Sequence, residues 1–426
     1  MRFFIPTMIV VFQVVHICGM PKAQRNPLVL FLLIVSGEAI FFLPFVLPRI
    51  FRPSILSEFN LTNLELGSAF SVYGIVAIVS YFFGGPLADR FSPRILIASA
   101  LCLTAFGGSA FLFEMTATSF LVLYGYWGFT TIFLLWAAMI KATRLWGGMG
   151  FQGRAFGLLE GGRGLTAALI GLLALGLLSS FSSSNNGSMR TVILASSALI
   201  FLIGLAVAFF MPSNEGKVQT LDHSMASNQV SLVLKNPLVW LQGLLIVFAY
   251  VGYKMTDDFS LYANEVLGFS EVESASIGTA ALWLRPLFAV LAGFAADRFS
   301  SLKVIAACFL IMIIGGAMIA AGFLETIVFW VFATMVFTVV GIYGLRGVYF
   351  AVIDDLNIPV ASTGTAVGVI SVLGYTPDVF ISPVMGYLLD TYPGAQGHQY
   401  VFMIIAGAGL FGLLTVMLLN RLLTKE

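Results

Sequence analysis

Seven charged side chains stand inside long apolar stretches of this chain, where a charge is costly to keep. A charge at the centre of a hydrocarbon layer costs several kcal/mol unless it faces a cavity, a partner or a ligand. Carboxylates and guanidinium groups at such positions are suited to binding protons or charged solutes. An enzyme would need a nucleophile beside a base, or metal ligands, and no such set stands at a useful spacing. The seven residues are Glu38, Glu160, Arg163, Lys254, Arg285, Arg346 and Asp378.

The deepest of these charges are the candidates for solute binding and coupling. With a helical rise of about 1.5 Å per residue, Glu38 and Arg285 lie about 15 Å into their apolar runs and Arg163 about 12 Å. Glu38 has no base nearby in sequence, so it either pairs across a cavity or takes up a proton, because burial favours its neutral form. Arg285 precedes Pro286 and has no acid within one turn, so it needs a spatial partner or an anionic ligand, and we favour the ligand. Glu160 and Arg163 are three residues apart and either neutralise each other or contact the solute.

The other charges lie nearer the ends of their runs. Lys254 has Asp257 at i+3 and Asp258 at i+4, and we interpret Lys254 and Asp258 as a pair at an outer gate. Asp378 follows a proline and either belongs to this gate or caps a helix break. Arg346 either contributes to the binding site or extends its side chain to the membrane interface.

The composition indicates that these charges are surrounded by a lipid bilayer. Hydrophobic residues make up 59% of the 426 positions and charged residues only 10%, where a soluble domain has roughly a quarter charged. The net charge of +1 gives no sign of a nucleic-acid partner. The three cysteines lie apart, and the three histidines stand near no other ligand-type cluster in the sequence. We therefore expect no disulfide framework, metal site or cofactor.

Apolar runs of about 20 residues recur twelve times, the length that a membrane-spanning helix needs. The one long polar stretch follows the sixth run and leaves about 185 residues on either side. Equal halves with six spans apiece indicate a duplicated bundle. We predict an all-α membrane protein with an N-terminal segment (1–26), two pseudo-symmetric six-helix bundles (27–211 and 238–426) and a cytoplasmic linker (212–237). The predicted spans are 28–51, 66–87, 95–113, 119–141, 155–180, 190–211, 238–260, 275–295, 303–323, 326–349, 362–388 and 400–422.

Lysine and arginine predict the orientation, because they stay on the cytoplasmic side. If the first span starts inside, the outer face receives only Arg49, Arg52 and Arg190. Both ends of the helical bundle and the linker are therefore expected to be cytoplasmic. The predicted cytoplasmic bases are Lys22, Arg25, Arg90, Arg94, Lys141, Arg144, Arg154, Lys217, Lys235, Arg298, Lys303, Arg421 and Lys425.

The apolar run from Phe3 to Cys18 does not fit this scheme. It is about 24 Å long as a helix, short for a span, and it begins after a single Arg2. We interpret residues 1–19 as a cleaved signal-like extension or an upstream start, with Met20 as the working initiator, rather than as a thirteenth helix.

One short motif occurs twice, at corresponding places in the two halves. The first copy, between spans two and three, reads GGPLADRFSPR from Gly84 to Arg94. The second, between spans eight and nine, reads GFAADRFSSLK from Gly293 to Lys303. The aspartates, at positions 89 and 297, are 208 residues apart. Such an aspartate is able to cap a helix or to pair with a base across the bundle.

This pattern resembles the Gly-x-Leu-Ala-Asp-Arg-x-Gly-x-Arg/Lys loop of the major facilitator superfamily, with a resemblance that covers residues 27 to 423. Ser92 and Ser300 stand where the family usually has its second glycine. In that family the loop forms part of the cytoplasmic gate. The alternative is that the two aspartates only cap helices and set the topology. The gate residues that the resemblance implies are Asp89, Arg90, Arg94, Asp297 and Arg298.

A looser resemblance connects the chain to the bacterial nitrate/nitrite porters and organophosphate antiporters. It is carried by GRAFGLLEGGRG, starting at Gly153, and by GYTPD, starting at Gly374. The porters' asparagine-containing glycine motif and their basic residue in span two are absent. The antiporters' paired arginines in spans one and seven are also absent, since span one carries Glu38. The substrate is therefore not transferred from either group.

These observations favour a secondary transporter that works by alternating access. Bases slightly outnumber acids near the midplane, which favours a small organic anion such as a carboxylate, sulfonate or phosphate ester. Proton coupling through Glu38 is the simplest drive, and we expect a monomer in a bacterial cytoplasmic membrane. The alternatives are an efflux carrier for hydrophobic compounds and a receptor that kept the fold without transport. The expected substrate-binding or coupling residues are Glu38, Glu160, Arg163, Arg285 and Arg346.

Overall fold

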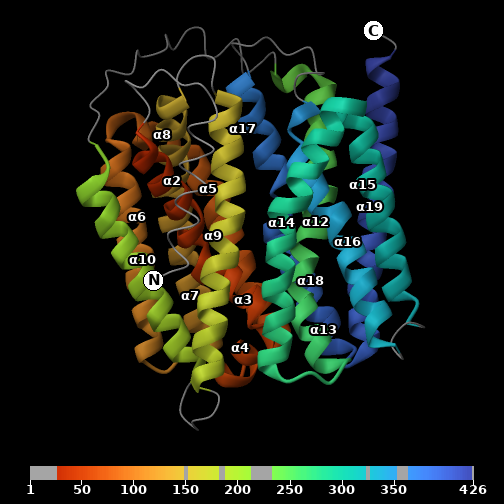
Figure 1. Ribbon diagram of the computed structural model, residues 1–426, viewed down its shortest axis with the longest axis horizontal. Helices are drawn as coiled ribbons and strands as arrows, with labels where there is room; N and C mark the ends of the chain where they lie inside the picture. Colours follow the sequence, from red (N-terminus) through yellow and green to blue (C-terminus); the bar gives the residue numbers. More distant parts are fainter. Residues whose placement is uncertain are drawn as a thin grey trace.

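The described part of the chain is a bundle of long helices that stand roughly side by side (Figure 1). The computed structural model describes residues 26–147, 152–181, 188–212, 233–322, 327–352 and 363–424. Within these ranges twelve helical segments are long and apolar enough to cross a membrane. The predicted all-α fold with twelve spans is thus confirmed. Residues 1–19 and most of the linker lie outside the described residues.

The first half contains spans one to six, three of which combine more than one helical segment. The short helix α4 (Arg52–Phe59) connects spans one and two. The six spans are α2 (Pro27–Phe41) with η1 (Phe42–Val46) and α3 (Leu47–Ile50); α5 (Asn63–Arg90); α6 (Pro93–Gly108) with η2 (Ser109–Leu112); α7 (Ala117–Gly128) with η3 (Phe129–Trp136) and α8 (Ala137–Gly147); α9 (Gln152–Phe181); and α10 (Ser188–Phe210).

The second half repeats this order, with interruptions in spans seven and eleven. Its six spans are α12 (Pro237–Met255) with η4 (Thr256–Asp258) and α13 (Phe259–Glu265); α14 (Glu271–Phe299); α15 (Ser301–Ala320); α16 (Val328–Val348); α17 (Thr363–Gly374) with α18 (Pro377–Thr391); and α19 (Ala395–Leu423).

Matching start signals show the duplication at the level of single hydrogen bonds. α2 and α12 both begin with Asn-Pro, and the side chains of Asn26 and Asn236 each accept a hydrogen bond from a backbone N–H two residues on, at 2.9 Å. α5 and α14 both begin with a capping box, formed by Thr62 with Glu65 and by Ser270 with Glu273. Each device satisfies N–H groups that a helix start leaves unpaired. The sequence therefore encodes the same helix starts twice.

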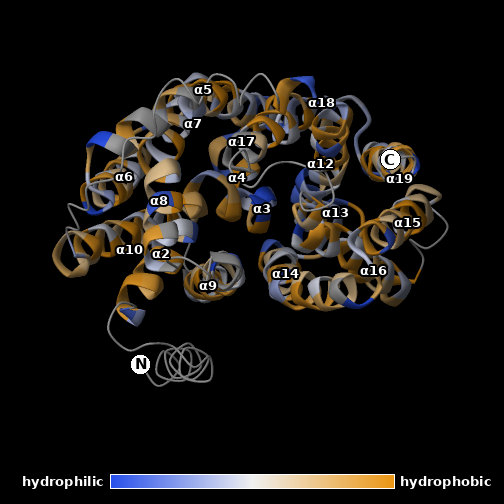
Figure 2. Cartoon of the chain, turned by 90° about the horizontal axis from the view of Figure 1, so that it is seen from above, coloured by the Kyte–Doolittle hydropathy of each residue, from blue (hydrophilic) through white to orange (hydrophobic). Residues whose placement is uncertain are grey.

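Each half has its own hydrophobic core, and the halves stand next to each other when seen from above (Figure 2). The first core draws on residues 29–211 with Ala275 and Leu282, and the second on residues 233–419. Large apolar side chains such as Phe83, Phe106 and Phe209 are more than half exposed on the outside. Exposed apolar surface of this kind is suited to lipid.

The end of the molecule that carries α3, α4 and α13, opposite the C-terminus in Figure 1, is called the distal end below. Here the two halves are joined by polar contacts. The carboxylate of Asp390, at the end of α18, accepts hydrogen bonds from the backbone N–H groups of Asn63 and Leu64, at 2.9 and 2.7 Å. Ser57 donates to Glu271 at 3.2 Å. Because these bonds connect the two bundles, the distal end is closed.

Close crossing of α5 and α18 completes this closure, and glycine makes it possible. A Cβ atom on Gly386 would overlap the backbone oxygen of Asn63, and one on Gly67 would overlap that of Ser382. Backbone atoms are unable to give way as a flexible side chain does. The closed distal end therefore requires glycine at both crossing points.

Gly386→Ala is expected to destabilise the closed state by about 1–3 kcal/mol, because the added methyl group overpacks a backbone contact. Gly407→Ala is the matched control, since a Cβ on Gly407 of α19 meets nothing within 4 Å. It is expected to stabilise the helix by about 0.5–1 kcal/mol. Thermal unfolding in detergent and cross-linking across the distal end are the measurements. Equal behaviour of the two variants would contradict the crossing argument.

Candidate functional site

Glu38 lies near the middle of span one, where it joins the two bundles through two arginines. Its side chain is 4% exposed. Arg163 of α9 approaches one carboxylate oxygen with Nε at 3.1 Å, and Arg285 of α14 approaches the other with Nη1 at 3.2 Å. Since Arg285 belongs to the second bundle, this carboxylate bridges the two bundles near the middle of span one. The structure thus provides bases from two other spans for Glu38 and a spatial partner for Arg285.

Arg163 is the central residue of the candidate site on the side of the first bundle. It donates to the backbone oxygen of Gly37 at 3.0 Å and to Glu160 at 2.5 Å. Its guanidinium carbon lies 5.6 Å from the ring centre of Phe41 and 5.8 Å from that of Trp136. Glu160 keeps 51% of its side chain exposed. The i,i+3 neutralisation predicted as one alternative is present, yet the exposed carboxylate still faces an accessible space.

Arg346 of α16 packs against tyrosines of the second bundle. Its guanidinium carbon lies 3.9 Å from the ring centre of Tyr253 and 5.8 Å from that of Tyr250. Its Nη1 atom is buried and has no hydrogen-bond partner among the described residues. The hydroxyl groups of Tyr349, just after α16, and Tyr375, just before α18, are 3.3 Å apart nearby. The side chain is therefore held among phenol rings, and its buried Nη1 is an unused donor within the described part of the chain.

A second charge cluster surrounds Lys254, and it differs from the predicted pair. The Nζ atom of Lys254 lies 3.6 Å from Asp257 and 3.6 Å from Asp378, while Asp258 makes its contact elsewhere. The reason is local: α12 ends at Met255, and in the following 3₁₀ turn residues three apart, rather than four, lie above one another. Asp378 also accepts a hydrogen bond from Tyr250 at 3.0 Å.

Two arginines that the charge distribution assigned to the outer face are buried rather than exposed. Arg49 is 5% exposed and forms an ion pair with Asp257, across the two bundles, and donates to Tyr253 at 2.7 Å. Arg52 is fully buried and donates to the side chain of Asn63. The signal available in the sequence was the adjacent pair Asp257 and Asp258, two acids with one base, Lys254, close by. Two carboxylates that become buried need additional bases beside them.

His398 is a third departure from the sequence analysis, which placed no histidine near a ligand-type cluster. It lies in the first turn of α19, fully buried, in contact with Asp258 and Glu265. The three residues are far apart in sequence, so only the tertiary structure brings them together. Among the described residues, no group of three or more His, Cys, Asp or Glu side chains has an arrangement that would hold a metal ion.

The repeated loop is largely helical. α5 continues to Arg90 and α14 to Phe299, so Asp89 and Asp297 belong to the last helical turns. The caps of the following helices are instead Ser92 and Ser300, whose side chains accept hydrogen bonds from Ile95 and Lys303. The side chains of Asp89 and Asp297 lie outside the described part of the chain. Arg90 and Arg298 are exposed and Arg94 is half-buried.

Ser300 has a φ of 138°, a conformation that favours glycine, at one of the two positions where the resembled motif has glycine. Ser300→Gly is expected to stabilise the protein by about 1 kcal/mol, because relief of strain exceeds the few tenths lost with the cap. Ser92→Gly is the control, since Ser92 has an ordinary φ of −66° and gains nothing. Thermal unfolding compares the two. A loss of stability in Ser300→Gly would contradict the strain argument.

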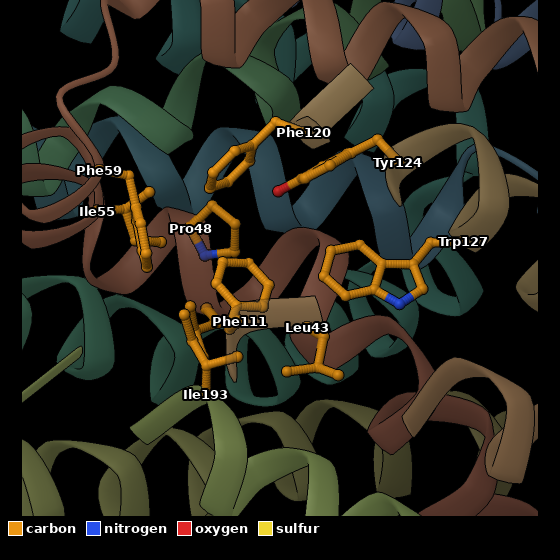
Figure 3. Close-up of a pocket in the computed structure, with 10 residues that line it drawn as sticks. Leu43, Pro48, Ile55, Phe59, Phe111, Phe120, Tyr124, Trp127 and Ile193 are labelled. Carbon is orange, nitrogen blue, oxygen red and sulfur yellow. The ribbon is translucent and has the colours of Figure 1, made fainter. Parts of the chain in front are cut away.

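An apolar cavity lies inside the first bundle, and no charged side chain lines it (Figure 3). Its volume is about 10 Å³, close to the minimum that one water molecule needs. Rings of Phe59, Phe111, Tyr124 and Trp127 line it. It is too small and too apolar for a charged solute, so the central charges remain the candidate site.

Comparison with known proteins places this architecture in a family. The sequence model of the Major Facilitator Superfamily matches residues 29–377. The chain is 27% identical to the inner membrane protein YqcE of Escherichia coli (strain K12) over 420 residues, which covers 95% of this chain and 97% of YqcE. It is 25% identical to the inner membrane protein YihN of the same organism over 413 residues, which covers 93% and 96%.

Solved structures show the same fold at low sequence identity. A variant of the nucleoside transporter NupG superposes with a TM-score of 0.72 and 14% identity, over 92% of this chain and 99% of that one. A bacterial homologue of the human lysosomal transporter Spinster, in an inward-facing and unoccupied conformation, gives 0.72 and 15% over 94% and 99%. The likeness concerns the fold alone.

These findings agree with the twelve spans and the duplicated halves. The protein is a multi-pass membrane protein with the fold of a secondary transporter, and it is a transporter rather than an enzyme. Its relatives' location is consistent with an inner membrane. The chain belongs to the Major Facilitator Superfamily.

Proposed function

We propose that the protein is a proton-coupled carrier of a small organic anion, which binds between the bundles at Glu38, Arg163 and Arg285. The supporting observation is the Glu38 carboxylate, which contacts an arginine of each bundle. A carboxylate of the solute has the same shape and charge as Glu38, and a sulfonate or phosphate also presents paired anionic oxygens. It would compete with Glu38 for the two guanidinium groups, which suit bidentate recognition of carboxylate, sulfonate and phosphate.

Proton coupling follows from that competition. When the solute takes over Arg285, Glu38 loses a partner and becomes a buried carboxylate without compensation. Such a charge costs several kcal/mol, and uptake of a proton removes it. The anion and the proton would therefore bind together and leave together.

The charge of the site supports the same scheme. With Glu38 and Glu160 ionised, the three arginines Arg163, Arg285 and Arg346 leave a formal charge of +1. Binding of a monovalent anion together with one proton restores +1, so the loaded and empty carriers have equal formal charge. Movement of the loaded bundles then places no additional charge in the bilayer.

The second bundle's wall suits the organic part of the solute. Tyr250, Tyr253 and the tyrosine pair near Arg346 offer ring faces and hydroxyl groups. The free donor on Arg346 would hold a second polar group. A hydroxylated or cyclic anion matches this combination better than a simple inorganic ion does.

The gates and the setting belong to the same proposal. Lys254, Asp258 and Asp378 lie on the distal side, and Asp89, Arg90, Arg94, Asp297 and Arg298 would form the cytoplasmic gate. The bundle ends would face the cytoplasm, as the distribution of lysine and arginine favours. The carrier would act as a monomer.

The test is uptake into proteoliposomes with an imposed pH gradient. The probes are a neutral hexose and its carboxylate, sulfonate and phosphate derivatives, each followed as the labelled compound. Wild type is expected to accumulate at least one of the anions and not the hexose. Arg285→Ala is expected to reduce the rate of this uptake about 30- to 1000-fold. That factor corresponds to a transition-state free energy about 2–4 kcal/mol higher.

Arg421→Ala is the matched control, because Arg421 is exposed in the last turn of α19. Full anion uptake by Arg285→Ala would contradict the anion site. Transport of uncharged hydrophobic dyes in place of the anions would favour an efflux carrier. Binding of an anion without any flux would favour a receptor.

A further inference from the structure

His398 lies between two carboxylates, in the first turn of α19 and remote from Glu38. Its ring is fully buried. Nδ1 lies 2.8 Å from a carboxylate oxygen of Asp258, and Nε2 lies 3.2 Å from one of Glu265. The ring of Tyr262 packs edge-on against it, with ring centres 5.3 Å apart. These three ionisable residues, His398, Asp258 and Glu265, are called the distal triad.

The hydrogen-bond geometry of the distal triad indicates how many protons it holds. A neutral imidazole carries one N–H and one lone pair, so only one of its nitrogens is a donor. The other nitrogen would then direct its lone pair at a carboxylate oxygen within hydrogen-bond distance, which is repulsive. An imidazolium ion donates from both nitrogens and satisfies both acids. The geometry therefore fits a triad that holds one proton more than a neutral histidine with two carboxylates.

Arg52 completes the charge balance from the other bundle. Burial lowers the pKa of Arg52, and Asp258 is the acid that opposes this most strongly. Arg52 donates only to the neutral side chain of Asn63, at 3.1 and 2.9 Å, and its Nη1 has no hydrogen-bond partner in the described part of the chain. The protonated triad carries a charge of −1, which Arg52 neutralises. Loss of the proton would leave one uncompensated negative charge.

The groups that form this charge balance lie where the two bundles meet. α4, which carries Arg52, packs against α13, which carries Glu265. Asp258 follows Asp257, whose ion pair with Arg49 crosses between the bundles. Separation of the distal ends would therefore take Arg52 away and admit water. An unbalanced charge costs several kcal/mol while it is buried and far less once it is hydrated.

We propose that the distal triad is a proton-binding site whose occupancy keeps the distal end of the carrier closed. With the proton bound, the buried cluster of triad and Arg52 is neutral and the closed state is stable. Without it, opening hydrates the surplus charge. Glu265 keeps 34% of its side chain exposed, so protons reach the triad from the distal side. The proposal requires only alternating access and is independent of the anion proposed above.

The remaining charged groups near the triad have contacts of their own. Arg49 and Lys254 contact Asp257. Asp390 accepts from the N–H groups at the start of α5. The ionisable groups on the elements that surround the triad are Asp257 on η4, Tyr262 on α13, Lys254 on α12, Arg49 on α3, Arg52 on α4 and Asp390 on α18.

The sign of the pH effect follows from linkage. The closed state binds the proton more tightly than the open state, so closure is favoured at low pH and lost as the pH rises through the titration of the triad. Release of one proton on opening changes the open-to-closed ratio by up to about tenfold per pH unit.

The experiment measures the distance across the distal end as a function of pH. Spin labels are placed at Glu114→Cys and Thr391→Cys, both exposed, in full-length protein in which the native cysteines are replaced. The protein is held in lipid nanodiscs between about pH 5 and about pH 10, a range that brackets histidine titration. The wild type is expected to be closed at low pH and to shift to longer distances as the pH rises.

Three variants separate a proton switch from a structural role. His398→Gln cannot carry the charge and is expected to be open at every pH. His398→Gln with Glu265→Gln leaves Asp258 balanced by Arg52, so it is expected to be closed at every pH. His223→Gln, in the linker sequence, is expected to behave as wild type.

A direct measurement covers the case in which His398→Gln fails to fold. In wild-type protein with ¹⁵N-labelled histidine, one of the three imidazoles is expected to be doubly protonated at neutral pH and to be missing from the His398→Gln/Glu265→Gln spectrum. A neutral His398 at neutral pH would overturn the proposal. So would pH-independent distances in wild type, or a double variant that stays open.

Discussion

Replacement of Glu38 by glutamine is expected to abolish proton-driven accumulation of the solute while solute exchange stays measurable. Glutamine keeps the shape of the side chain but is unable to release or accept the coupling proton. A gradient of about one pH unit supports about tenfold accumulation if one proton accompanies each anion. The variant is expected to equilibrate its substrate and to accumulate none. The measurement is uptake into proteoliposomes with and without the gradient, beside counterflow with preloaded substrate.

Glu114→Gln is the control for this result, because Glu114 is exposed and lies outside the site. The counterflow arm separates loss of coupling from loss of folding or of binding. Accumulation by Glu38→Gln at the wild-type level would show that the proton binds elsewhere. Loss of both accumulation and counterflow would instead assign Glu38 to the positioning of Arg163 and Arg285, against the coupling role.

Removal of Arg49 is expected to open the distal end by the largest factor among single substitutions there. Arg49 is 5% exposed and its partner Asp257 is 1% exposed, so Arg49→Met leaves a buried carboxylate whose remaining ion-pair partner among the described residues is Lys254. Truncation of one partner of a buried pair costs about 3–5 kcal/mol. The open state hydrates the remaining charge, so the open-to-closed ratio should rise on the order of a hundredfold or more.

Cross-linking between Ser57→Cys and Glu271→Cys measures this ratio, because the native side chains meet across the bundles at 3.2 Å. The double variant Arg49→Met/Asp257→Asn removes both charges. It is expected to recover most of the cross-linking, since loss of a whole buried pair is far less costly than loss of one member. If the double variant were as open as the sum of the single variants predicts, Arg49 and Asp257 would not be coupled.

The central charges show how the free-energy cost of burying a charge allows site residues to be identified from the sequence. Glu38, Arg163 and Arg285 were identified because an isolated charge in an apolar run demands a partner or a ligand. Their mutual contacts were beyond prediction, since the three residues belong to spans one, five and eight. Periodicity describes the face of one helix and carries no information about which helix lies opposite.

Lys254 and its acids show a different limit. The i+4 spacing to Asp258 predicts a pair only if the α-helix continues, but α12 ends at Met255 and a 3₁₀ turn follows. The turn directs Asp257 toward Arg49 and Lys254 and leaves Asp258 for His398. Two adjacent aspartates therefore serve different partners.

The sequence by itself determined the lipid setting, the twelve spans, the duplication and the family motif. These follow from composition, from apolar run length and from a repeat, all of which are local or additive properties of the chain. The tertiary structure alone decided the partners of each charge: the bridging position of Glu38, the burial of Arg49 and Arg52, and the distal triad. The physical reason is that a buried charge is stabilised by groups within about 4 Å, and those groups come from helices that are distant in sequence.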